Sequence, residues 1–157
     1  MTRFVGSLAV FVFAVALVPM APAQDVVAPI RQAIDGFNSG DTQSFFAACT
    51  PNQMSIIDEF APYRWIGPHA AQDWAAAYDK HAQATGVTDG SVKYSKPTRI
   101  EIEGSSAYVI VPTVYVYKQN AKPTTEEGQM TFSLHREAAG WKITAWTWTG
   151  VKPHPTM

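Results

Sequence analysis

Asp58 is the acidic residue best placed for chemistry, since it follows two isoleucines and lies just before Phe60. A carboxylate in apolar surroundings loses solvation, so its pKa rises and it can act as a general acid or base. Tyr63 and Trp65 follow closely and would add aromatic surface. The alternative is a turn-forming aspartate that bonds the backbone near Ala61-Pro62. Asp58 is therefore the candidate catalytic residue, with the turn as its competing role.

The remaining residues with catalytic potential form no motif. The four histidines have no zinc-binding spacing, so we predict neither a metal nor a cofactor. His81 could border a pocket, or lie in solvent at a helix end where the dipole favours it. The chain has no Ser-His-Asp order, nucleophile elbow or phosphate loop.

Aromatic and hydroxyl side chains are the second lead. Tyr, Trp and Thr bring polar groups that a sealed core must satisfy, whereas apolar walls with a few hydroxyls are typical of a small-molecule pocket. A packed core is the alternative for any single residue. We predict a pocket for a small apolar or aromatic molecule. Its predicted lining residues are Tyr63, Trp65, Trp74, Tyr78, Thr113, Tyr115, Met130, Phe132 and Thr147, and Tyr117 and Thr149 converge on the same region.

Residues 105–150 must position much of this set. They form three strand-like runs rich in β-branched and aromatic residues, separated by two polar turns, which predicts an antiparallel meander. Unbroken period-2 alternation in the last run places Trp146 and Trp148 on the face opposite Ile143. Because soluble monomers rarely expose large apolar patches, we predict a homodimer through this outer face, formed by Ile110, Val114, Val116, Trp146 and Trp148.

The elements before the meander follow from periodicity, capping residues and breakers. Helices are predicted over residues 25–38, 41–50 and 68–86. Two short strands are predicted within residues 54–67, and a further strand over residues 92–103, where Pro97 indicates a bend or an edge. The order α-α-β-β-α-β-β-β-β predicts an α+β domain with its helices on one face of a curved sheet.

Residues 1–23 have the pattern of a cleaved signal peptide. Arg3 precedes an apolar run over residues 4–18, and Ala21-Pro22-Ala23 follows as a cleavage site. A membrane anchor is the alternative, but the run is shorter than the roughly 20 residues that a bilayer requires. Cleavage would leave one domain over residues 24–157, secreted or periplasmic and without a stable membrane anchor.

Charge and cysteine content exclude several partners. Without Arg3 the chain has 11 basic and 13 acidic residues, a net charge of −2, and it has no basic run, so nucleic acid is not expected as a partner. Cys49 is the only cysteine, which excludes an intrachain disulfide.

The order of elements resembles the nuclear transport factor 2-like superfamily, which includes SnoaL-like and ketosteroid-isomerase-like proteins. The resemblance rests on a first helix followed by N-S-G-D at residues 38–41, a short helix, a two-strand insertion with an acid, a Gly-opened third helix, and a meander ending in G-W-K-I at residues 140–143. It covers nearly all of residues 24–157. It implies a cone-shaped, curved antiparallel or mixed sheet wrapped on three N-terminal helices, a pocket between them, and often a dimer through the outer face.

The resemblance also bears on activity. It places the acid of isomerases and cyclases at about Asp58, if one residue is inserted in the preceding loop. The oxyanion-hole tyrosine would fall near Ala33 and the second acid at Met130, and neither can donate a hydrogen bond, so we expect no efficient steroid isomerisation. Three functions stay open, and the sequence does not decide whether the chain is an enzyme. They are an exported small-molecule-binding domain, a lyase, isomerase or cyclase that uses Asp58 as general acid or base, and a non-catalytic dimeric scaffold.

Overall fold

The computed structural model describes residues 25–156, and its elements follow the predicted order with two additional strands. The helices are α1 (Ala28–Ser39), α2 (Thr42–Ala48) and α3 (Ala70–Thr85). The strands are β1 (Met54–Ile57), β2 (Arg64–Gly67), β3 (Val87–Tyr94), β4 (Arg99–Glu103), β5 (Ser106–Gln119), β6 (Lys122–Glu137), β7 (Gly140–Gly150) and β8 (His154–Pro155). The predicted strand over residues 92–103 is two strands, because the chain breaks around Pro97 and β3 starts earlier.

The signal peptide predicted over residues 1–23 lies outside the described residues, so it stays a prediction. Within residues 25–156, none of the helices combines the length and the apolar character needed to cross a membrane.

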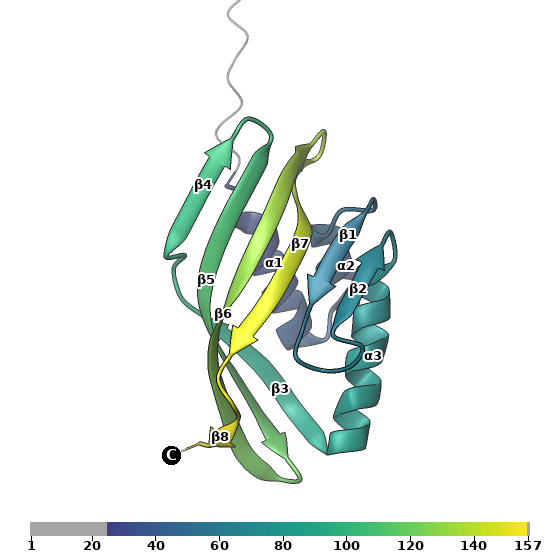
Figure 1. Ribbon diagram of the computed structural model, residues 1–157, viewed down its shortest axis with the longest axis vertical. Coiled ribbons are helices and arrows are strands. Elements are labelled where there is room, and N and C mark those ends of the chain that lie inside the picture. Colours follow the sequence, from purple (N-terminus) through teal and green to yellow (C-terminus); the bar gives the residue numbers. More distant parts are fainter. Residues whose placement is uncertain (1–24, 157) are drawn as a thin grey trace, which may run out of the picture.

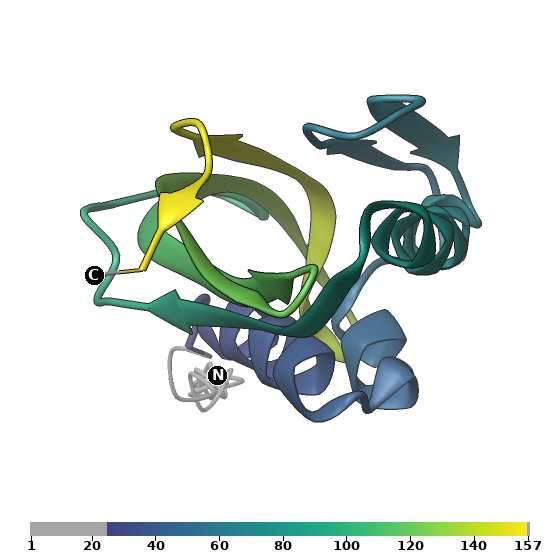
Figure 2. The same cartoon turned by 90° about the horizontal axis from the view of Figure 1, so that it is seen from below.

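The strands form one mixed, open sheet in the order β2-β1-β7-β6-β5-β3, with β4 paired to β5 and β8 paired to β6. Strand β1 runs parallel to β7, and the other named pairs are antiparallel. The sheet curves from β3 round to β7, and α3 lies between β3 and the β1–β2 hairpin (Figures 1 and 2). Three helices against a curved mixed sheet confirm the predicted α+β class.

Local residue chemistry explains where α1 ends and where α2 begins. Before α1, whose N-cap residue Val27 has no side-chain cap, Asp25 Oδ1 accepts a hydrogen bond from the Val27 backbone N–H at 2.9 Å. The Asp41 side chain caps α2 by accepting from the Ser44 N–H at 3.0 Å. Gly40 follows α1 with a φ of 73°, the left-handed conformation that glycine adopts without steric cost.

The close approach of α1 to α2 depends on Gly36. A Cβ atom added at Gly36 would lie 2.8 Å from the Phe45 backbone nitrogen. Only glycine allows the two helices to meet at this distance. The contact places the Phe45 ring beside Trp74 of α3, with ring centroids 5.5 Å apart.

The apolar core occupies one half of the concave face, where α1 covers the sheet. The largest fully buried side chains come from α1, β1, β5, β6 and β7, and they are Ile30, Ile56, Val109, Val111, Phe132, Leu134 and Ile143. Towards the other end of β5 and β6, the same face carries Tyr115, Tyr117 and Glu126 instead. The character of the concave face therefore changes along the length of its central strands.

A β-bulge in β7 corrects the predicted faces of Trp146 and Trp148. Ser133 pairs with Ala145, but Leu134 pairs with Ile143, so β7 has one extra residue at this point. Beyond the bulge, Trp146 lies opposite Phe132. Directly opposed residues share a face, so both tryptophans point into the concave side. The prediction that they form the outer face is wrong because it assumed an unbroken alternation.

The outer face is consequently less apolar than predicted. Ile110, Val114 and Val116 do lie on it and are half-buried. Their cross-strand neighbours on β6 are Thr131, Glu127 and Thr125. The outer face thus has an apolar strip along β5 beside a polar strip along β6.

Candidate functional site

A cavity of about 370 Å³ lies between the concave face of the sheet and the helices. Ten of its 22 lining residues are aromatic, namely Phe37, Phe45, Phe60, Trp74, Tyr78, Tyr115, Tyr117, Phe132, Trp146 and Trp148. Its charged or titratable remainder consists of Asp58, Glu59, His81 and Glu126. Within the described part of the chain, no lysine or arginine lines it.

The structure brings together six of the predicted site residues at this cavity, namely Asp58, Trp74, Tyr78, Tyr115, Met130 and Phe132. Tyr63 is 60% exposed, and Trp65 is buried against Phe60 with ring centroids 5.1 Å apart. Thr113 is buried away from the cavity lining, and Thr147 lies on the outer face opposite Thr131. These four residues do not line the cavity. Thr147 was misplaced by the same bulge that misplaced the two tryptophans.

Asp58 lies in the loop between β1 and β2 and has both carboxylate oxygens occupied. Trp74 Nε1 donates to Oδ2 at 2.8 Å, and the Glu59 backbone N–H donates to Oδ1 at 2.7 Å. Loss of solvation raises the pKa of Asp58 above its ordinary value, and these two hydrogen bonds partly oppose the rise. The bond to the Glu59 N–H is a local backbone bond of the kind expected if Asp58 forms a turn. The bond to Trp74 fixes the carboxylate at the cavity wall.

Two further acids, Glu59 and Glu126, meet beside the cavity. Glu126 is only 2% exposed, and Tyr117 Oη donates to its Oε1 at 2.6 Å. Glu59 is an exposed residue whose carboxyl group lies near that of Glu126, since the charge of Glu126 acts on it. Loss of solvation, then the neighbouring Glu126 carboxylate, then the charge of Asp58 raise the pKa of Glu59 to about 8. The nearby Trp148 indole lowers the pKa of Glu59 and so opposes part of this rise. Its N–H has no acceptor in good hydrogen-bond geometry.

Sequence reasoning missed this pair for different reasons. Glu126 was taken as part of a polar turn, whereas the turn is formed by Asn120 and Ala121, which have φ values of 50° and 66°. Glu126 therefore lies within β6, opposite Tyr115 and in phase with Met130. Alternation continued backwards from Met130 would have found it. Glu59 gave no signal beyond its position next to Asp58.

A pair of tyrosine hydroxyls forms the wall next to β3. Tyr78 Oη and Tyr115 Oη lie 2.6 Å apart, and the Tyr115 ring stacks on Tyr117 with centroids 4.7 Å apart. A Cβ atom at Gly90 would come within 2.7 Å of both hydroxyl oxygens, so the β3 backbone approaches them closely. Burial raises the pKa of Tyr78 and Tyr115, which keeps both phenols neutral donors.

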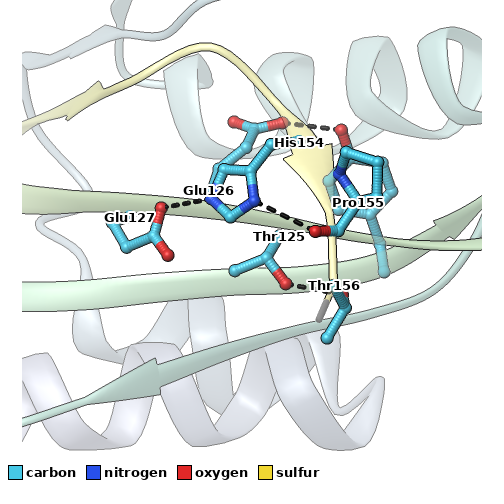
Figure 3. Close-up of polar contacts among 7 residues, drawn as sticks. Thr125, Glu126, Glu127, His154, Pro155 and Thr156 are labelled. Atoms are coloured by element: carbon cyan, nitrogen blue, oxygen red, sulfur yellow. Dashed lines mark hydrogen bonds and ion pairs between the residues drawn. The ribbon is translucent and has the colours of Figure 1, made fainter.

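The segment after β7 folds back over the strand that carries Glu126. In β8, His154 pairs with Thr125 of β6, and its Nε2 lies 2.7 Å from Glu127 Oε2 (Figure 3). The hydroxyls of Thr125 and Thr156 lie 2.6 Å apart in the same contact (Figure 3). Pro153 reaches the edge of the cavity. This segment therefore holds β6 in place where Glu126 faces inwards.

Among residues 25–156, no group of three or more His, Cys, Asp or Glu side chains is arranged to hold a metal ion. His81, which lines the cavity, instead stacks on Phe60 with ring centroids 5.0 Å apart. The site can thus offer carboxyl groups, phenols and aromatic surface to a bound molecule.

Comparison with known proteins identifies the fold through solved structures, without a match to a family model or a curated protein. No family model matches the chain, and no curated protein matches it significantly. Solved structures do match. Hexachlorocyclohexane dehydrochlorinase LinA-type3 from Novosphingobium barchaimii has a TM-score of 0.67 at 12% identity, covering 82% of this chain and 88% of that one. A ketosteroid isomerase-like protein from Erwinia carotovora atroseptica has a TM-score of 0.60 at 18% identity, covering 82% and 95%.

A third match is a nuclear transport factor 2-like superfamily protein from Salmonella enterica, with a TM-score of 0.67 at 13% identity over 81% of this chain and 89% of that one. The chain therefore has the nuclear transport factor 2-like fold, as its order of elements predicted. Enzymes occur among the proteins with this fold.

Glu59 should make the protein less stable as the pH rises. Its folded-state pKa of about 8 exceeds its ordinary value of 4.5, so between these values the folded chain keeps a proton that the unfolded chain has released. The stabilisation is fully present below the lower value and is lost as the pH rises through the upper one. Glu59→Gln replaces the titrating O–H with an amide N–H that can face Glu126 at any pH, so thermal unfolding should show a flatter fall in Tm between about pH 5 and pH 9.

The control for this measurement is Glu103→Gln, which removes an exposed carboxylate from β4 and should keep the wild-type slope. A Glu59→Gln variant with the same slope as the wild type would show that the pair does not hold the proton.

Proposed function

We propose that the chain, exported as residues 1–23 predict, binds a small and largely apolar molecule with a flat ring system in the cavity. The observation that carries the proposal is the cavity itself, since about 370 Å³ is within the range of small-molecule sites. Its walls are aromatic rings, and its few polar groups converge from the β1–β2 loop, α3, β5 and β6. Such walls favour flat apolar rings by stacking and burial, while the polar groups would orient the ligand.

The similar structures support this proposal at the level of the fold. One is a hexachlorocyclohexane dehydrochlorinase, whose name describes action on a small chlorinated ring compound. A domain of this fold can therefore hold an apolar ring. The identity of the ligand of the present chain rests on its own side chains.

Filling the cavity should abolish binding. We expect 2-(2-naphthyl)ethanol to bind the wild-type protein in isothermal titration calorimetry, and Met130→Trp to weaken binding at least about tenfold because the indole occupies the ligand's space. Val92→Phe, on β3, provides a second filling variant. Gln129→Trp adds the same indole to the adjacent, outward-facing position and should bind like the wild type. Equal binding by all four proteins would contradict the proposal.

A second candidate function is proton transfer by Asp58. The favouring observation is that its carboxylate is fixed by two donors at the cavity wall with a raised pKa. A general base in such a position can remove a proton from carbon next to a carbonyl group. This function would use the same cavity and would make the chain an enzyme.

Deuterium exchange into 2-tetralone, followed by NMR, tests this candidate with a bicyclic ketone. Wild-type protein should accelerate exchange at the carbon next to the carbonyl, and Asp58→Asn should lose about 10²- to 10⁴-fold of that acceleration. Trp74→Phe removes a hydrogen bond that lowers the Asp58 pKa, so it should move the pH profile of exchange upwards. Exchange by Asp58→Asn at the wild-type rate would leave only the binding function.

We also propose that the strip of Ile110, Val114 and Val116 contributes to a homodimer interface, now without the two tryptophans. Light scattering at micromolar concentration should give a dimer mass for the wild type. The double substitution Ile110→Glu and Val114→Glu should give a monomer, because it buries charge at the interface. Gln83→Glu with Ala84→Glu, on an exposed stretch of α3, should remain a dimer. A monomeric wild type would rule the interface out.

A further inference from the structure

The cavity has three acids and, in the described part of the chain, no lysine or arginine. Asp58, Glu59 and Glu126 line it, and His81, which stacks on Phe60, acts on Asp58 and lowers the pKa of that carboxyl group. A buried carboxylate normally requires a paired cation or several hydrogen bonds. Asp58 has two donors, but Glu126 has only the Tyr117 hydroxyl.

Two buried polar atoms next to the acid pair are unsatisfied. Glu126 Oε2 accepts no hydrogen bond from an N–H or from Tyr117, and Trp148 Nε1 has no acceptor in good geometry. Glu126 is 98% removed from solvent, so water does not compensate for this. Buried polar groups in folded proteins are nearly always paired, and an unpaired acceptor aimed into a cavity indicates the position of a ligand's donor.

The aromatic rings around the acid pair are held firmly. Gly128 and Gly150 face each other across β6 and β7, and the Trp148 indole lies over both, within 3.0 Å and 2.7 Å of where their Cβ atoms would be. Tyr115 meets the Trp148 ring edge to face with centroids 6.4 Å apart. These rings therefore stand beside the carboxyl pair and can offer their electron-rich faces to a positive charge.

We propose that the cavity binds a protonated amine, with the ammonium group between Glu59 and Glu126 and the apolar body of the ligand against the aromatic walls. This inference rests on the proposed binding function and adds the chemical class of the ligand. The ammonium N–H groups would satisfy Glu126 Oε2. Its positive charge would offset the negative charge that Glu59 gains when its carboxyl group releases the proton.

An alcohol would fit the same cavity less well. A hydroxyl group donates one hydrogen bond and brings no charge, so the pair would have to keep its own proton. In the empty site Glu59 holds that proton near neutral pH, since its pKa is about 8. An ammonium group takes the place of the proton, which leaves to solvent, so amine binding releases up to one proton. The other titratable groups facing the pair are Asp58, Tyr78, His81, Tyr115 and Tyr117.

Three probes with the same bicyclic body test the inference, namely 2-(2-naphthyl)ethylamine, 2-(2-naphthyl)ethanol and 2-naphthylacetate. Calorimetry at pH 7 in phosphate and in Tris buffer measures both affinity and proton release, because the two buffers differ in ionisation enthalpy. We expect the amine to bind at least about tenfold more tightly than the alcohol, with a buffer-dependent enthalpy, and the carboxylate to bind most weakly. Binding of the alcohol should show no buffer dependence.

Variants of the pair assign the effect to its residues. Glu126→Gln should lose the preference for the amine and the proton release while still binding the alcohol, and Glu59→Gln gives a second test if Glu126→Gln does not fold. Glu103→Gln changes the net charge equally on exposed β4 and should keep the preference. If the alcohol binds as tightly as the amine and no proton is released, the inference is wrong and the binding function stands. If none of the three probes binds, the binding function itself fails.

Discussion

The central strands of the sheet are longer than the helix that covers them, and the cavity follows from this mismatch. Helix α1 has 12 residues and spans about 18 Å, whereas β5 and β6 have 14 and 16 residues and span about 46 and 53 Å. One helix therefore covers less than half of the concave face. Helix α3 and the β1–β2 hairpin stand beside the uncovered half of the sheet (Figure 2). The cavity lies between these elements and the sheet.

This division of the concave face also separates two kinds of chemistry. Under α1 the side chains are aliphatic and fully buried, as a close-packed core requires. Beyond it the sheet carries phenols, indoles and an acid, which need hydrogen bonds or charge partners that the protein supplies only in part. Asp58 has a donor on each oxygen, whereas the second oxygen of Glu126 has none. Asp58 is thus preorganised, and Glu126 depends on whatever its neighbour Glu59 or a ligand provides.

Local signals were sufficient for the elements and for part of the site. Caps such as Asp41 and breakers such as Gly40 act within a few residues, so the helices could be placed from sequence. Asp58 and Trp74 could both be assigned to the pocket from sequence, because the β1–β2 loop and α3 that carry them are predictable elements. In the structure the two side chains are hydrogen-bonded. The dimer interface, the signal peptide and the binding roles stay predictions, because they depend on partners or residues that this structure does not describe.

The errors had non-local causes. The position of Glu126 in a strand depends on where the β5–β6 turn forms, and the polar residues after it concealed that point. The faces of Trp146 and Trp148 depend on a bulge whose residues have no distinctive composition, since a bulge is a property of backbone pairing between two strands. Tyr63 is near Asp58 both in sequence and in space, since the Asp58 N–H donates to the Tyr63 carbonyl oxygen at 3.2 Å, but the Tyr63 side chain is exposed and does not line the cavity.

The extra residue in β7 has a consequence for comparing this chain with others of the same architecture. Two sequences that differ by a single residue between Ile143 and Trp146 would turn the last strand inside out relative to each other. An alignment that pairs them residue for residue through this point would equate a lining side chain of one with a surface side chain of the other. Any transfer of residue roles along β7 must therefore place its gap at Thr144, before the two tryptophans are matched.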